Sequence, residues 1–127
     1  MKIPTSFDNL NRVLPLAETP NHATPEGAEA DAWQDNNGEL FRLVYKTSRG
    51  IAQRPDATVL LSAVQLGDGT IDKGDRLEPP VLYVDVQDGR GLTSVQARSL
   101  ATALVNAAAE LDRWVRYELP SPIDGGA

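Results

Sequence analysis

Residues 92–117, which read LTSVQARSLATALVNAAAELDRWVRY, are the stretch that decides the fold. Thr93 and Gln96 have the spacing of a capping box, in which each side chain bonds to the backbone N–H of the other residue at a helix N-terminus. Apolar residues then recur in steps of four and three, which places them on one side of an α-helix. The sequence therefore predicts a helix over 94–117 whose apolar stripe is Ala97, Ala101, Leu104, Ala108, Leu111 and Val115, broadened by Leu100, Ala107 and Trp114.

Three segments before the helix have the β-branched and aromatic content of strands. They cover residues 40–46, 58–65 and 81–86, and residues 30–34 are a shorter fourth candidate in which Trp33 is expected to point inward. The turn signal Asp35-Asn36-Asn37-Gly38 separates the fourth candidate from the first, because Asn and Gly tolerate the positive φ of tight hairpins. This order favours an α+β fold: a three- or four-stranded antiparallel β-meander with one long C-terminal helix packed across one face.

The chain is expected to form one domain between two less regular segments. Its 127 residues are enough to bury roughly two thirds of the surface of the unfolded chain. Residues 1–30 combine a short helix over 6–14 with a Pro-rich flexible segment, in which Pro20, Pro25 and Gly27 interrupt regular structure. Residues 31–119 form the single α+β domain, the region 48–56 within it is a polar loop, and residues 120–127 form a C-terminal tail.

Composition and charge narrow the functional classes. The absence of cysteine fits a reducing cytoplasm and removes thiolate zinc sites and cysteine nucleophiles. No stretch approaches the roughly 18 apolar residues of a membrane span, and the N-terminus has no secretory h-region, so we expect a cytoplasmic protein with no membrane partner. The formal charge of −6 argues against nucleic acid as a partner, because phosphate binding relies on Lys and Arg.

Motifs that carry chemistry are incomplete in this sequence. His22, the only histidine, lies in the Pro-rich segment without a metal-binding or catalytic partner beside it, and we expect it to be exposed and inert. A calcium loop starting at Asp68 would have Lys73 where an EF-hand needs Gly, and Pro79 where it needs Glu. We therefore predict no catalytic residues, no metal and no cofactor. An enzyme with an unrecognised carboxylate-based site remains the last alternative, with the candidate pairs Asp31 with Asp35 and Asp85 with Asp88.

The strands carry more apolar residues than one covered face requires. Residues 58–65 are apolar on both sides, whereas a sheet exposed on one face alternates apolar and polar residues. The face opposite the helix needs a cover, either the N-terminal segment around Phe7, Leu10 and Leu14 or a second chain. The possible interface consists of Leu40, Val44, Leu60, Val64, Val81 and Tyr83.

These patterns favour a small non-enzymatic protein that acts through protein–protein contacts. Its partner is an unknown protein or a second copy, which would make a homodimer. The alternative is a nucleic-acid-binding regulator that uses the arginines on the helix flank, chiefly Arg98 and Arg116.

The C-terminal stretch also resembles a recurring sequence ending. Residues 92–104, LTSVQARSLATAL, and 107–113, AAAELDR, are similar to the C-terminal helix of small uncharacterised proteins from actinobacteria and their phages. In those proteins LTxxQARxLAxAL follows a strand and leads into AAxELD. The resemblance implies a strand-then-helix fold and a bacterial or phage cytoplasmic setting, with an accessory or regulatory role. It covers about a quarter of the chain and has no catalytic residues to transfer.

Overall fold

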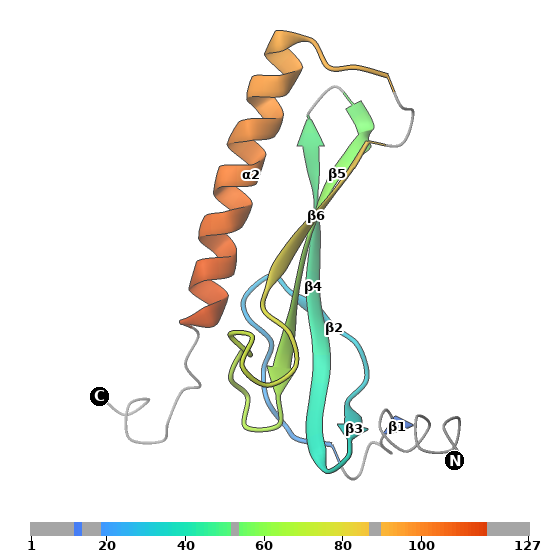
Figure 1. The fold of residues 1–127 in the computed structure, drawn as a ribbon, viewed down its shortest axis with the longest axis vertical. Coiled ribbons are helices and arrows are strands. Elements are labelled where there is room, and N and C mark those ends of the chain that lie inside the picture. The colour runs from blue at the N-terminus through green and yellow to red at the C-terminus, as the bar shows by residue number, and fades with distance from the viewer. Residues whose placement is uncertain (1–11, 14–18, 52–53, 87–89, 117–127) are drawn as a thin grey trace.

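The computed structural model describes residues 12–13, 19–51, 54–86 and 90–116. Its elements are β1 (Arg12–Val13), β2 (Glu29–Ala30), β3 (Gln34–Asn36), β4 (Glu39–Ile51), β5 (Arg54–Leu66), β6 (Val81–Val86) and α2 (Ser94–Val115). Strands β3 to β6 form an antiparallel meander, while the short β1 and β2 pair with β3 and β4. Helix α2 runs alongside this sheet and packs against it (Figure 1), which confirms the predicted α+β fold.

The hairpin of β4 and β5 is the frame of the molecule. Each strand has 13 residues, so the pair extends well beyond the two strands that the sequence predicts. Within the expected polar loop over 48–56, residues 48–51 belong to β4 and residues 54–56 to β5 instead. The pairing shifts between Arg49 and Ile51, and a Cβ on Gly50 between them would lie 3.2 Å from Cδ1 of Leu100. A glycine at this position therefore allows the strand and the helix to approach closely.

Asn37 and Gly38 connect β3 to β4 as the two residues of a tight hairpin. Their φ angles are 54° and 95°, and a type I′ turn needs positive φ at both positions. The N–H of Gly38 donates a hydrogen bond of 2.6 Å to Oδ1 of Asp35. The predicted turn is therefore confirmed, and so is the inward position of Trp33, which is 3% exposed.

The N-terminal segment differs from the predicted flexible segment wherever the structure describes it. Residues 19–30 pack on the sheet, because Pro25 is fully buried and β2 pairs with β4. Arg12 and Val13, expected within the short helix over 6–14, form β1 instead. The rest of that helix and the tail over 120–127 lie outside the described residues. The packed domain therefore begins before residue 31.

A buried polar network explains why this segment lies on the sheet. The guanidinium of Arg42 stacks 4.5 Å from the ring centre of Trp33 and donates to the carbonyl oxygen of His22 at 2.8 Å. Arg42 also donates to Oε1 of Gln65 at 2.7 Å, and Nε2 of Gln65 donates to the carbonyl oxygen of Ala23 at 2.9 Å. Since buried polar groups need partners, these bonds fix the path of residues 22 and 23.

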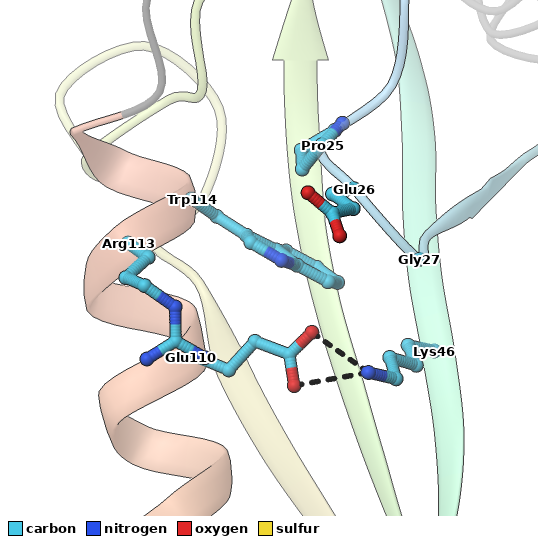
Figure 2. A pocket seen from close by; sticks show the side chains of 7 residues that line it. All are labelled: Pro25, Glu26, Gly27, Lys46, Glu110, Arg113 and Trp114. Atoms are coloured by element: carbon cyan, nitrogen blue, oxygen red, sulfur yellow. Dashed lines mark hydrogen bonds and ion pairs between the residues drawn. The ribbon is translucent and has the colours of Figure 1, made fainter.

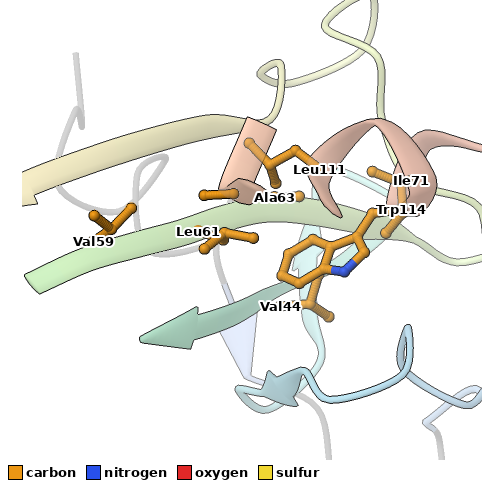
Figure 3. Packing of buried hydrophobic residues seen from close by; sticks show 8 residues of the cluster. Val44, Val59, Leu61, Ala63, Ile71, Leu111 and Trp114 are labelled. Atoms are coloured by element: carbon orange, nitrogen blue, oxygen red, sulfur yellow. The ribbon is translucent and has the colours of Figure 1, made fainter. Parts of the chain in front are cut away.

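The core lies between α2 and the face of the sheet that carries Val44, Leu61 and Ala63 (Figure 3). The helix contributes Leu111 and Trp114 to this core, and the indole of Trp114 lies beside Val44. The predicted stripe is wrong in one respect, since the alanines at 97, 101 and 108 are exposed. The reason is that α2 packs mainly on β4 and β5, which leaves the side of the helix towards β6 uncovered.

Thr93 and Gln96 form the predicted capping box at the start of α2. The N–H of Gln96 donates to Oγ1 of Thr93 and the N–H of Thr93 donates to Oε1 of Gln96, both at 3.1 Å. This arrangement satisfies two backbone donors that a helix N-terminus otherwise leaves to water.

Replacing Thr93 with alanine is expected to lower the free energy of unfolding by about 1 kcal/mol, because the cap is lost. Urea denaturation followed by circular dichroism measures this change. Ser94→Ala, at the exposed neighbouring position, is the matched control and should have little effect. Equal losses in the two variants would contradict a specific contribution of the capping box.

Candidate interaction surface

The six residues of the predicted interface do not share one face of the sheet. Pairing sets Val44 opposite Ala63 and Leu43 opposite Val64, so Val44 lies on the face that the helix covers. Leu40 is on the same side of β4, because side chains alternate along a strand. Val44 is fully buried and cannot form an exposed interface. The grouping is wrong because alternation in each strand does not fix the register between strands, and an offset of one residue exchanges the faces.

The other four residues lie on the face opposite the helix. Tyr83 pairs with Leu60, and Val81 pairs with Ser62. Val64 is buried at 2% exposure, Leu60 and Val81 are half-buried, and Tyr83 is 56% exposed. Exposed apolar surface is therefore concentrated at β6.

Strand β6 is the last strand of the sheet in the part of the chain that the structure describes. Its strand neighbour there is β5, so the outer side of β6 presents backbone N–H and C=O groups to which no described strand is paired. Tyr83 and Val84 are 56% and 47% exposed and point to opposite faces. Natural proteins usually protect an edge strand with charged residues or Pro, and in VLYVDV the single charge is Asp85, next to the end of the strand. The edge of β6 is therefore suited to pairing.

The flank of α2 beside β6 is apolar as well. Ala108 and Leu82 line a cavity of about 480 Å³ between the two elements. Ala101 and Val105 precede Ala108 at helical spacing and share its side of the helix, where Val105 is 68% exposed. We call Leu82, Val84, Ala101, Val105 and Ala108 the α2–β6 face. An exposed apolar surface of this kind is typical of a binding site for another protein.

A polar cavity of about 450 Å³ lies on the opposite flank of α2, against β4 (Figure 2). The ammonium of Lys46 donates to both carboxylate oxygens of Glu110, at 2.9 and 3.2 Å. The indole of Trp114 lies between this ion pair and the turn at 25–27, and its Nε1 has no acceptor among the described residues. The lining consists of Pro25, Glu26, Gly27, Lys46, Glu110, Arg113 and Trp114. The ion pair of Lys46 and Glu110 at this cavity attaches the helix to β4.

The acidic loop between β5 and β6 uses its carboxylates to organise turns. Asp72 is 1% exposed and accepts four hydrogen bonds of 2.6–3.2 Å from the backbone N–H groups of Gly74, Arg76, Leu77 and Glu78. Burial alone would raise the pKa of Asp72, but these donors outweigh burial and hold the pKa below its ordinary value. Asp68 accepts from the hydroxyl and the N–H of Thr70, and these bonds lower the pKa of Asp68. These hydrogen bonds fix the turns of the loop that precedes β6.

His22 belongs to the attachment of the N-terminal segment, which corrects its expected exposure. Its Nε2 lies 2.9 Å from the carbonyl oxygen of Gly67. Its ring meets Trp33 edge-on with 6.3 Å between ring centroids. The described residues contain no cluster of three or more histidine or acidic side chains that could hold a metal ion.

The two arginines of the nucleic-acid alternative lie far apart on the helix. Arg98 and Arg116 are both exposed, but 18 positions of helix separate them by about 27 Å, so they do not form one basic cluster. Asp35 is engaged in the β3–β4 turn, and Asp88 lies outside the described residues. No helix in the described ranges has the length and apolar character needed to cross a membrane.

Comparison of the chain with protein-family models, with curated proteins and with solved structures finds no match. The resemblance of residues 92–113 to actinobacterial and phage proteins therefore stays a prediction. The candidate surface depends on the geometry of this chain alone: an open strand edge beside an uncovered helix flank.

Proposed function

We propose that this protein has no enzymatic role and acts through protein–protein contact at the α2–β6 face. The observation that carries the proposal is the open edge of β6, where neighbouring residues Tyr83 and Val84 are about half exposed on opposite faces of the sheet. An edge of this kind binds by adding a strand, with backbone bonds supplying affinity and side chains supplying specificity. A cytoplasmic bacterial or phage accessory protein is the setting that we propose with this function.

Burial of the exposed valines on the α2–β6 face is too small to account for binding by itself. Covering the exposed parts of Val84 and Val105 would contribute about 2 kcal/mol in total. Association costs at least about 4 kcal/mol in lost translational and rotational freedom. The rest of the affinity would come from backbone hydrogen bonds along β6 and from burial of the exposed part of Tyr83.

Site-specific photo-crosslinking tests this function. A photoreactive p-benzoylphenylalanine replaces Val105 on the α2–β6 face. The matched control replaces Val95, which is 69% exposed but lies about 15 Å closer to the helix N-terminus. In cells that express the full chain, irradiation is expected to give protein adducts from position 105 and few from position 95. No adduct from position 105, or equal yields from both positions, would overturn the proposal. The mass of the adduct distinguishes a second copy from a different protein.

A further inference from the structure

We infer that the strand added to β6 is β6 of a second copy of this chain, antiparallel and centred on Val84. This inference rests on the proposed function, because it names the occupant of the α2–β6 face. A two-fold axis through the pair sets the same surface of each copy against the other. Self-pairing therefore requires that the residues of β6 complement one another in reverse order.

The order of residues in β6 meets this requirement. With the axis at Val84, that residue faces its own equivalent and Leu82 faces Val86 of the second copy. These three residues lie on the helix side of the sheet, because they pair with Leu61, Val59 and Ala57 of β5. On the other side, Tyr83 faces Asp85 of the second copy, and a phenol hydroxyl can donate to a carboxylate. Apolar side chains thus meet apolar ones, and the carboxylate meets a donor.

Neighbouring registers fit less well. An axis at Asp85 would set two carboxylates directly opposite each other, which is destabilising. An axis at Tyr83 would set Asp85 opposite the apolar Val81. An axis at Leu82 would set Val84 opposite Pro80, which precedes β6 and has no N–H to donate. The charge and the proline at the two ends of β6 therefore favour the register centred on Val84.

The arrangement of the layers also permits this pairing. Helix α2 packs mainly on β4 and β5, so it does not cover the outer side of β6 in the described structure. Two copies can then join their meanders into one sheet, which removes an open edge from each. The exposed part of Val84 becomes buried against its equivalent, and the two apolar flanks of α2 border the joined strands.

Single cysteines test the register, because the chain has none of its own. In Val84→Cys the two thiols lie opposite each other, with Cα atoms about 4.5–5.5 Å apart, which is suitable for a disulfide. Mild oxidation is expected to convert this variant into a dimer of twice the 13.7 kDa chain mass. Tyr83→Cys is the matched control, since its two thiols are not opposite each other, and it should stay uncross-linked on a non-reducing gel.

Light scattering on the purified wild-type chain provides the second readout, and a dimer is expected. Val84→Lys should be monomeric with an unchanged circular dichroism spectrum, because it sets two ammonium groups opposite each other at a half-exposed position. A wild-type monomer at all concentrations, together with no disulfide in Val84→Cys, would overturn the inference. Adducts from position 105 to a different protein would still support the proposed function in that case. A disulfide formed faster by Tyr83→Cys than by Val84→Cys would overturn the register.

Discussion

Asp72→Ala is expected to lower the free energy of unfolding by about 2–4 kcal/mol. The substitution removes a carboxylate that is 1% exposed and accepts four backbone hydrogen bonds. Each donor left without a partner in a buried site costs about 1–3 kcal/mol, and water reaching the exposed part of the loop reduces the total. The same loop places Ile71 in the core and leads to the start of β6. Loss of the Asp72 carboxylate should therefore weaken the packing of Ile71 and the pairing of β6 as well. Urea denaturation at neutral pH measures the effect.

Two variants make this measurement specific. Asp72→Asn keeps one accepting oxygen but sets an NH2 group against the other two N–H donors, so it should also lose stability if both oxygens are needed. Asp75→Ala changes an exposed carboxylate in the same loop and should be nearly neutral. A change of less than about 0.5 kcal/mol in Asp72→Ala, the range of ordinary surface substitutions, would contradict the role of this carboxylate.

Asp72 also makes stability depend on pH. The pKa of Asp72 in the folded protein is below its ordinary value of 3.8. Its stabilisation is therefore fully present above that value and is lost as the pH falls through the folded-state pKa. Part of the wild-type loss of stability in acid should be missing in Asp72→Asn. Asp68 acts with the same sign through Thr70, so some acid sensitivity should remain in that variant.

Leu111→Asp is expected to unfold the protein, whereas Ala108→Asp, one turn away, should leave it folded. Leu111 is 7% exposed within the core, and a carboxylate there would be buried without a partner. Ala108 is exposed, so the cost is about 0.5–1 kcal/mol of helix propensity. Far-ultraviolet circular dichroism and urea denaturation at low protein concentration separate the two outcomes.

This pair also tests the orientation of α2. The stripe inferred from the sequence places both residues towards the sheet, so unfolding of both variants would favour that orientation and contradict the structure. If Leu111→Asp stays folded, both the orientation inferred from the sequence and the orientation in the structure are contradicted, because both place Leu111 towards the sheet.

Local signals in the sequence are sufficient for the features that depend on a few neighbouring residues. The capping box of Thr93 and Gln96 and the hairpin turn at Asn37-Gly38 are each determined by backbone geometry within four residues. The α+β fold also follows from the sequence, because strand composition and helical periodicity distinguish the two kinds of element. These features could be predicted without knowing any long-range contact.

Features that depend on distant residues could not be predicted in the same way. The register between β4 and β5 decides that Val44 lies under the helix, and no local pattern reports it. The packing of residues 19–30 depends on Arg42 and Gln65, which read in the sequence as ordinary strand residues. The open edge of β6 could have been suspected from VLYVDV, which lacks Lys and Pro, but only the strand order shows that β6 is last in the described sheet.

The network around Gln65 constrains how this sequence can diverge. Its acceptors at positions 22 and 23 are main-chain oxygens, so substitutions of those side chains leave the bonds intact. Gln65 has no such latitude, because it is fully buried and one of its amide donors needs the carbonyl oxygen of Ala23. A descendant that lost the segment would leave this donor buried without its acceptor. Gln65 and the segment are therefore expected to be kept or lost together.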